Sequence, residues 1–373
     1  MSDREPIFVT QPALPDLEAF MPYLREIWDR RMLTNGGPME QRLEAALCDY
    51  LGVKHISLFC NGTQALITAV QAAGLSGEVI TTPYSFVATA HSLLWNHLTP
   101  VFVDIDPSTM NIDPARIEAA ITERTTAILP VHCYGHPCDV QGIRQVAERH
   151  GLKVIYDAAH AFGVRDEGGS LLRHGDLSVL SFHATKVFST FEGGAIICPD
   201  EATKRRVDQL KNFGLVPGGA TVEFVGTNGK MSEIHAAFGL LQLEHLIEAL
   251  DRRRLIDQRY REGLAKVAGI RCIDGVGEHL ANHAYFPILV EPSYPLARDV
   301  LFEHLAAHQI HGRLYFQPLL SNLPMYRDLP SANPANLTVA NRVVGQVICL
   351  PIYPNLEHET VDFIIGLIAG TNA

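Results

Sequence analysis

The chain has 373 residues, of which 47% are hydrophobic and 19% are charged, an ordinary composition for a globular protein with a sizeable core. Its formal net charge of −11 argues against bulk binding to nucleic acid or to an anionic membrane. No apolar run approaches the ~20 residues that span a bilayer, and residues 1–16 lack the apolar centre of a secretory signal. The seven cysteines are scattered without a C-x-x-C pair, which disfavours a disulfide framework. We therefore expect a cytoplasmic protein of about two domains.

The first two-thirds of the chain alternate short apolar runs with helix-like stretches. Helical patterns occupy 63–73, 113–122 and 139–150. Such alternation predicts an α/β sheet with helices on both faces, whose ligands collect beyond the carboxyl ends of the strands. The apolar runs predict buried strands at 55–60, 78–82, 100–104, 126–132, 153–156, 178–182 and 195–198.

A long helix-like stretch from about 231 to 264 separates this region from the rest. Beyond residue 269 the strand and helix signals are shorter and prolines are frequent, which predicts a smaller α+β domain. We place the boundary so that 1–250 forms a large α/β domain and 251–373 a small C-terminal domain. No Gly/Ser-rich spacer appears between them, so the long helix is the expected link.

The first polar segment of interest runs from Phe59 to Leu66, where a strand ends, a glycine follows and a helix begins. Such a junction presents free backbone N–H groups and the positive end of a helix dipole. Gly62 and Thr63 could therefore hold a phosphate. A simple turn followed by a helix cap explains the same residues about equally well. The segment is not a Walker loop, and no G-x-G-x-x-G motif follows the first strand.

A second polar segment follows the strand predicted at 153–156. Asp157 ends this apolar strand, where a buried carboxylate costs free energy unless it is paired. A protonated pyridine nitrogen is one partner that would keep Asp157 ionised. On this segment alone, an aspartate that caps the next turn is the favoured interpretation. His160 could lie beside the same ligand or satisfy a loop carbonyl.

The third segment carries Lys186, which follows the strand predicted at 178–182. Most lysines are solvated surface charges, and nothing in this position alone sets Lys186 apart. A lysine at the mouth of an apolar site, however, loses its proton readily and adds to carbonyl groups. Ser181 and the pair Gly193–Gly194 would offer further donors and a close approach of the backbone.

The phosphate loop, the strand-end aspartate and the strand-end lysine occur in the order typical of one family. The chain resembles the DegT/StrS family of sugar aminotransferases, which are fold-type-I pyridoxal-phosphate enzymes. This resemblance implies a large domain with a mostly parallel seven-stranded sheet sandwiched by helices, and a smaller C-terminal α+β domain. The similar runs cover nearly the whole chain in the family's order: Asn61–Leu66, Pro83–Thr89, Pro130–Gly135, Asp157–His160, Ser181–Lys186, Glu192–Gly194, Gly226–Met231 and Leu350–Pro354.

The resemblance also implies roles for individual residues. Lys186 would be the catalytic lysine that holds pyridoxal 5'-phosphate as a Schiff base, and Asp157 would pair with the pyridine nitrogen. The cofactor would alternate with pyridoxamine 5'-phosphate. The other implied contacts are from Gly62, Thr63 and Ser181 to the phosphate, from Phe86 stacked on the ring, from His160 near the 3-hydroxyl, and from Asn228 to the phosphate of the neighbouring subunit. The last contact implies a homodimer with shared active sites.

The surroundings of the lysine resemble one branch of the family. His183, Glu192 and the stretch Arg313–Leu319 are similar to members that act on 4-keto sugars. The expected reaction moves the amino group of L-glutamate to carbon 4 of a nucleotide-linked 4-keto-6-deoxy sugar, converting dTDP-4-keto-6-deoxyglucose to dTDP-4-amino-4,6-dideoxyglucose. Amination of a 3-keto sugar is the alternative within the family.

Lys230, Arg313 and Tyr315 are candidates for contacts to the pyrophosphate of the sugar nucleotide. A surface or inter-domain contact explains each of them equally well. The family often has arginine where Lys230 stands, and the lysine keeps the charge but loses a bidentate fork. His160 likewise replaces the family's commoner glutamine.

Other classes of protein fit the sequence less well. A non-enzymatic, pyridoxal-phosphate-binding regulatory protein is disfavoured by the intact lysine and aspartate. A Rossmann dehydrogenase would need a glycine fingerprint that the chain lacks. Four clustered side chains suggest a metal site, but their spacing fits no standard zinc pattern, so we expect no metal: His132, Cys133, His136 and Cys138.

Overall fold

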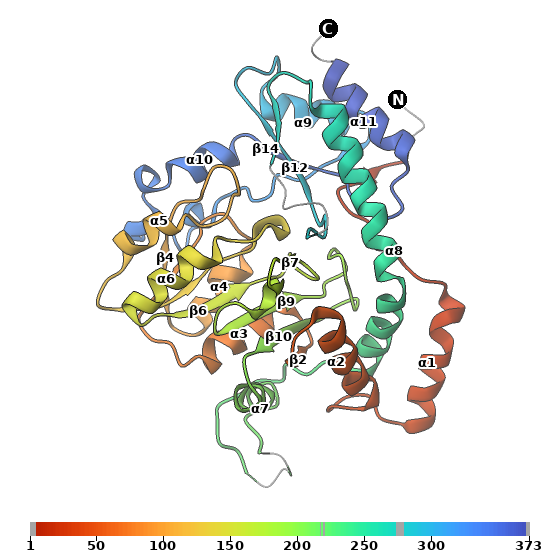
Figure 1. Cartoon of the computed structure of the whole chain (residues 1–373), viewed down its shortest axis with the longest axis vertical. Helices are drawn as coiled ribbons and strands as arrows, with labels where there is room; N and C mark the ends of the chain where they lie inside the picture. Colours follow the sequence, from red (N-terminus) through yellow and green to blue (C-terminus); the bar gives the residue numbers. More distant parts are fainter. Residues whose placement is uncertain (1–4, 217, 219–220, 274–279, 371–373) are drawn as a thin grey trace.

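A seven-stranded sheet forms the centre of the larger part of the molecule (Figure 1). The computed structural model describes residues 5–216, 218, 221–273 and 280–370. β10 is antiparallel to both of its neighbours, and the other neighbouring pairs are parallel. The prediction of a mostly parallel sheet is confirmed, and each predicted strand is matched within three residues at either end. In spatial order the strands are β2 (His55–Phe59), β10 (Gly194–Cys198), β9 (Leu177–Ser181), β6 (Lys153–Asp157), β5 (Thr125–Leu129), β3 (Glu78–Thr81) and β4 (Thr99–Phe102).

The strands are apolar throughout because both faces of the sheet are covered. Along β10, Ala195 and Ile197 join one hydrophobic cluster with helix α2 (Pro38–Leu51). Ile196 points to the opposite face and joins a second cluster with helix α3 (Gly62–Ala72). The two layers of helices therefore bury the sheet on both sides.

Side-chain caps fix where several of these helices begin. Asn61 accepts a hydrogen bond at the start of α3, and aspartates do the same for other helices. The stretch predicted as a helix over 113–122 forms only a short helix, α5, followed by a 3₁₀ turn at Glu118–Ala120. The helices that aspartates cap are α1 (Leu17–Arg30), α5 (Pro114–Ile117), α6 (Val140–His150) and α7 (Glu201–Leu210), while α4 (Ala88–Trp95) lacks such a cap.

Helix α8 (Glu233–Leu264) joins the two parts of the molecule, as the long helical pattern predicted (Figure 1). Its first half contributes Leu246 to the cluster beneath the large sheet, and its second half contributes Ile256 to another cluster. The division of the chain at residue 250 remains a prediction that this change of partner supports.

The smaller part is built on an antiparallel three-stranded sheet. An unforeseen feature is a parallel pair between β1 (Ile7–Phe8) and β13 (Ile310–His311), which places the first strand with the C-terminal part. A hairpin of β7 (Arg165–Asp166) and β8 (Gly169–Ser170) lies apart from both sheets. The remaining elements are β11 (Ile270–Cys272), β12 (Phe286–Val290), β14 (Val347–Leu350), α9 (Arg298–Ala307), α10 (Thr338–Val344) and α11 (His358–Gly370). None of the helices within the described ranges has the length and apolar character needed to cross a membrane.

Asp104 fastens the large sheet to the start of α10. Asp104 is 1% exposed, and its carboxylate accepts 2.8 Å hydrogen bonds from the backbone N–H groups of Val339 and Ala340. Asp104→Ala leaves both donors without an acceptor, so we expect the free energy of unfolding to fall by about 2 kcal/mol in chemical denaturation. Asp113→Ala, which removes a more exposed cap of α5, should cost roughly half as much. Equal losses in the two variants would contradict the role of Asp104.

Candidate active site

A cavity of about 530 Å³ opens at the carboxyl edge of the large sheet, where the sequence predicted a ligand. It receives polar side chains from the loops that follow β2, β3, β6 and β9. The structure thereby brings together most of the predicted site residues, from loops far apart in sequence. Those in its wall are Gly62, Thr63, Phe86, Asp157, His160, Ser181, Lys186 and Tyr315.

One end of the cavity is formed by the start of α3. The side chain of Asn61 accepts a 2.8 Å hydrogen bond from the N–H of Gln64, which leaves the N–H groups of Gly62 and Thr63 ahead of it without intrahelical partners. A Cβ on Gly62 would lie 2.9 Å from the Cβ of Ser181. Only glycine therefore lets the helix start approach the Ser181 hydroxyl, and together they form a compact set of donors for an anion.

The buried residue Asp157, which is 4% exposed, also lines the cavity. It accepts hydrogen bonds from the hydroxyl of Thr89 at 2.7 Å and from the N–H of Ala159 at 3.1 Å. Ser85 continues this chain at 2.7 Å from Thr89. Burial raises the pKa of Asp157 despite these bonds. A cation bound within the cavity would favour the ionised form of Asp157, and a protonated pyridine ring is such a cation.

Lys186 extends into the same cavity. Burial lowers the pKa of its amine to about 8, which Asp157 opposes as the nearest charge of opposite sign. The amine donates a 3.1 Å hydrogen bond to the hydroxyl of Tyr285. A substantial fraction of Lys186 is therefore neutral near physiological pH, as a nucleophilic lysine requires.

His160 lies beside Lys186 and is buried. The backbone N–H of Tyr134 donates to its Nδ1 at 3.2 Å, so the neutral ring carries its proton on Nε2. Burial, reinforced by the charge of Lys186, keeps the pKa of His160 well below its usual value. The imidazole is therefore a neutral hydrogen-bond donor, held parallel to the ring of Phe316 at 5.9 Å.

Tyr315 is the one predicted substrate residue that lines the cavity. Its carbonyl accepts hydrogen bonds from the hydroxyls of Tyr84 at 2.8 Å and Tyr134 at 2.6 Å. Both tyrosines are buried, so this segment of the smaller part is held firmly against the large sheet. Phe86, on the loop that follows β3, also lines the cavity and has 60% of its surface exposed.

Three predicted site residues lie outside the cavity wall. Asn228 is exposed and pairs through its backbone with Asn212. The Lys230 amine donates to Asn212 at 2.8 Å and lies over the ring of Phe213. Arg313 is exposed, and its backbone pairs with Cys349. The roles assigned to them remain predictions.

The cluster of histidines and cysteines set aside earlier is involved in packing. The ring of His132 stacks on Tyr156 at 4.6 Å, and its Nδ1 accepts a hydrogen bond from the N–H of Cys138. Burial lowers the pKa of His132 to about 3. No group of side chains suited to a metal ion occurs within the described part of the chain.

Two polar contacts of the site escaped the sequence analysis. Thr89 belongs to the run Pro83–Thr89, but nothing in the sequence linked its hydroxyl to Asp157, 68 residues away. Tyr285 precedes β12 and reaches the cavity from the smaller part. Its spacing from Lys186 carries no signal, because only the packing of the two parts brings them together.

Comparison with known proteins identifies the kind of site. The DegT/DnrJ/EryC1/StrS aminotransferase family model matches residues 16–369. The chain belongs to this family. A dTDP-4-amino-4,6-dideoxy-D-glucose transaminase from Shigella dysenteriae is 56% identical, covering 98% of this chain and 99% of its own. An enzyme of the same name from Escherichia coli is 53% identical, covering 99% of this chain and all of its own.

Solved structures agree with this assignment. DesI, crystallised in the presence of its TDP-sugar product, has a TM-score of 0.93 at 38% identity and covers 98% of this chain and 93% of its own. The fold is therefore that of the fold-type-I aminotransferases, as predicted, and the chain is a pyridoxal-phosphate-dependent sugar aminotransferase. This membership favours an enzyme over the regulatory protein considered from the sequence.

The hydrogen bond between Lys186 and Tyr285 can be tested by removing one hydroxyl. Tyr285→Phe keeps the ring but releases the amine, so we expect kcat to fall about tenfold while the KM of the amino donor changes less than twofold. Tyr23→Phe, which loses a hydroxyl contact to Glu244 outside the cavity, is the matched control. An unchanged kcat in Tyr285→Phe would show that this contact does not assist the lysine.

The lowered pKa of Lys186 predicts a pH dependence for cofactor uptake. Only the neutral amine reacts, so the rate at which cofactor-free protein takes up pyridoxal phosphate should rise with pH and level off above about 8. Stopped-flow absorbance measures this rate. An uptake rate that continues to rise toward pH 10.5, the ordinary pKa of lysine, would contradict the lowered pKa of Lys186.

Proposed function

We propose that the enzyme transfers the amino group of L-glutamate to carbon 4 of dTDP-4-keto-6-deoxyglucose and so forms dTDP-4-amino-4,6-dideoxyglucose. The observation that carries this proposal is the extent of the likeness to two transaminases named for that product, above 50% identity along the whole chain. His183 and Glu192, the residues that resemble the 4-keto branch, both line the cavity. Their side chains face each other, with Nε2 and Oε1 3.7 Å apart.

The cavity residues fit pyridoxal phosphate. Gly62, Thr63 and Ser181 supply donors for its phosphate, and Asp157 supplies a buried counter-charge for its ring nitrogen. Phe86 offers an exposed aromatic face for the ring, and His160 offers a neutral donor on its Nε2 side. When bound, the cofactor supplies an electron sink that stabilises negative charge on the carbon bearing the amino group.

The protein's own part in the reaction is to hold charge and to move protons. Asp157 keeps the ring nitrogen protonated because the two charges stabilise each other. The buried carboxylate has little contact with water, so a cation is its main source of stabilisation. With the cofactor bound, the Lys186 amine would act as the base that takes a proton from the amino-donor carbon and as the acid that gives it back. The Tyr285 hydroxyl, 3.1 Å away, holds the amine over the cavity between these transfers.

Binding of the sugar nucleotide involves the smaller part of the molecule. Tyr315 stands in the cavity wall, and the exposed Arg313 lies two residues before it. We assign Arg313 and Lys230 to the pyrophosphate because both cations are accessible, whereas no arginine lines the cavity within the described chain. Tyr315 then contacts the sugar end of the substrate.

We further propose that the enzyme is a cytoplasmic homodimer with shared active sites. Asn228 is exposed outside the cavity of its own chain, as expected of a residue that serves a neighbouring subunit. Several large apolar side chains near it are also exposed, among them Phe213 at 49% and Val225 at 87%. Contact with a second subunit would bury this apolar surface.

The reaction is tested with purified enzyme, L-glutamate and dTDP-4-keto-6-deoxyglucose, and with the 3-keto isomer in parallel. We expect an amino sugar only from the 4-keto substrate, identified by mass spectrometry and NMR. Lys186→Ala should give no product and lack the yellow absorbance of lysine-bound cofactor, while Lys153→Ala at an exposed lysine should behave as wild type. Amination of the 3-keto isomer alone would overturn the assignment of the substrate.

A further inference from the structure

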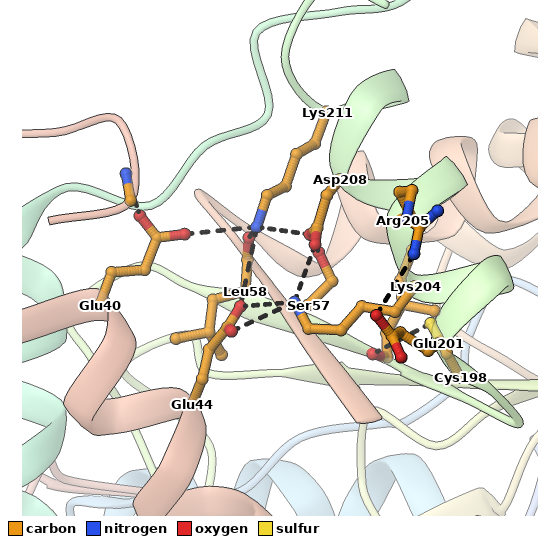
Figure 2. Close-up of polar contacts among 12 residues, drawn as sticks. Glu40, Glu44, Ser57, Leu58, Cys198, Glu201, Lys204, Arg205, Asp208 and Lys211 are labelled. Atoms are coloured by element: carbon orange, nitrogen blue, oxygen red, sulfur yellow. Dashed lines mark hydrogen bonds and ion pairs between the residues drawn. The ribbon is translucent and has the colours of Figure 1, made fainter. Parts of the chain in front are cut away.

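A network of charged side chains surrounds the buried amine of Lys211 (Figure 2). It joins α2, β2 and α7, and its central cation is Lys211. The Lys211 amine contacts Glu40 at 3.3 Å and Asp208 at 3.1 Å, and it donates to the carbonyl of Leu58 at 3.1 Å. Only 7% of Lys211 is exposed, so these partners replace water around its charge.

The charges of this network do not cancel. Three carboxylates, Glu40, Glu44 and Asp208, surround two amines, Lys204 and Lys211. Glu40 is only 3% exposed, and Lys211 is the one cation within 4.0 Å of it among the described residues. Nearby carboxylates outweigh burial and raise the pKa of Lys211. Lys211 therefore stays charged, and its loss would leave Glu40 buried without a counter-charge.

The main chain of Lys211 is tied to the segment that carries Asn228. The carbonyl of Lys211 accepts a 2.8 Å hydrogen bond from the N–H of Gly229, and Asn212 pairs with Asn228 in an antiparallel bridge. The Gly229 carbonyl in turn accepts a 2.7 Å hydrogen bond from the N–H of Cys60. The segment from 227 to 230 thus lies between the end of α7 and the end of β2.

Lys211 therefore links the charged network to the 227–230 segment. The Lys211 side chain is fixed by α2 and β2, while its backbone fixes Gly229. Lys204, by contrast, contacts Glu44 and Asp208 and makes no ion pair or side-chain hydrogen bond to the described residues 227–230. Asn228, within the 227–230 segment, is exposed and lies outside the cavity wall of its own chain.

We propose that Lys211 is a positioning residue that acts across the dimer, holding Asn228 where it meets the cofactor phosphate of the partner subunit. This inference rests on the proposed function, which assigns that contact to Asn228. Lys211 itself touches no substrate or cofactor. Loss of its ion pairs frees the 227–230 segment and weakens cofactor binding in the other subunit.

The first experiment measures the affinity of purified dimers for pyridoxal phosphate by absorbance titration. Lys211→Met should raise the Kd at least tenfold. Lys204→Met is the matched control. It removes the other amine of the same network, and Lys204 does not contact the 227–230 segment. It should lower the melting temperature while leaving the Kd within twofold of wild type. Equal effects of the two substitutions on the Kd would overturn the proposal.

The second experiment separates action across the dimer from action within one subunit. Heterodimers are made by co-expression with two affinity tags, and only sites with an intact Lys186 give the yellow absorbance. With Lys211→Met and Lys186→Ala on different chains, the remaining lysine site has a partner with an intact network, and its Kd should match wild type. With both substitutions on one chain, the remaining site should be weakened as in the Lys211→Met homodimer.

The reverse pattern would show that Lys211 acts within its own subunit, and equal weakening of both heterodimers would indicate a general loss of structure. Either result overturns the proposal. If Lys211→Met does not fold, Lys211→Met with Glu40→Gln removes the unpaired carboxylate and takes its place in each dimer. A wild-type protein that is monomeric or takes up no cofactor would refute the proposed function instead, before any variant is compared.

Discussion

The architecture of the site depends on a buried carboxylate that is held by neutral hydrogen-bond donors. Asp157 lies at the end of the central strand β6, and its hydrogen bonds come from the neutral donors Thr89 and Ala159. No ion pair reaches it within the described residues. Such a group is costly unless a cation joins it. Asp157 is only 4% exposed, and the cavity beside it is lined by the rings of Tyr285, Tyr315 and Phe316, so a protonated ring within the cavity is a suitable partner.

The same burial acts in opposite senses on the groups around the cavity. It raises the pKa of Asp157 and lowers those of Lys186 and His160. The lysine thereby becomes a usable nucleophile and base, and the histidine a neutral donor. Lys186 and Asp157 moderate one another, because each favours the charged form of the other. A bound ring cation would take over the partnership with Asp157 and leave the lysine free to exchange protons.

Much of the fold was predictable because local sequence patterns determine its strands and helices. Continuous apolar runs marked the buried strands such as 153–156, and the polar residues that follow strands marked the site. The pairing of β1 with β13 was not predictable, since its partners lie some three hundred positions apart and span only two residues each. The contact of Tyr285 with Lys186 was missed for the same reason. It arises only when the smaller part packs on the larger one, and no spacing in the sequence encodes that.

The buried charges around Lys211 are better explained by position than by stability. Removing two charges from water costs several kcal/mol each, and apolar side chains of similar volume often stabilise a fold as well or better. Apolar packing, however, does not fix the orientation of a side chain as hydrogen bonds and ion pairs do. The Lys211 amine must meet Glu40, Asp208 and the Leu58 carbonyl at once, which leaves the backbone that follows α7 little freedom. The contact that we propose between Asn228 and a neighbouring subunit would need such fixing, because residues 227–230 do not line the cavity of their own chain.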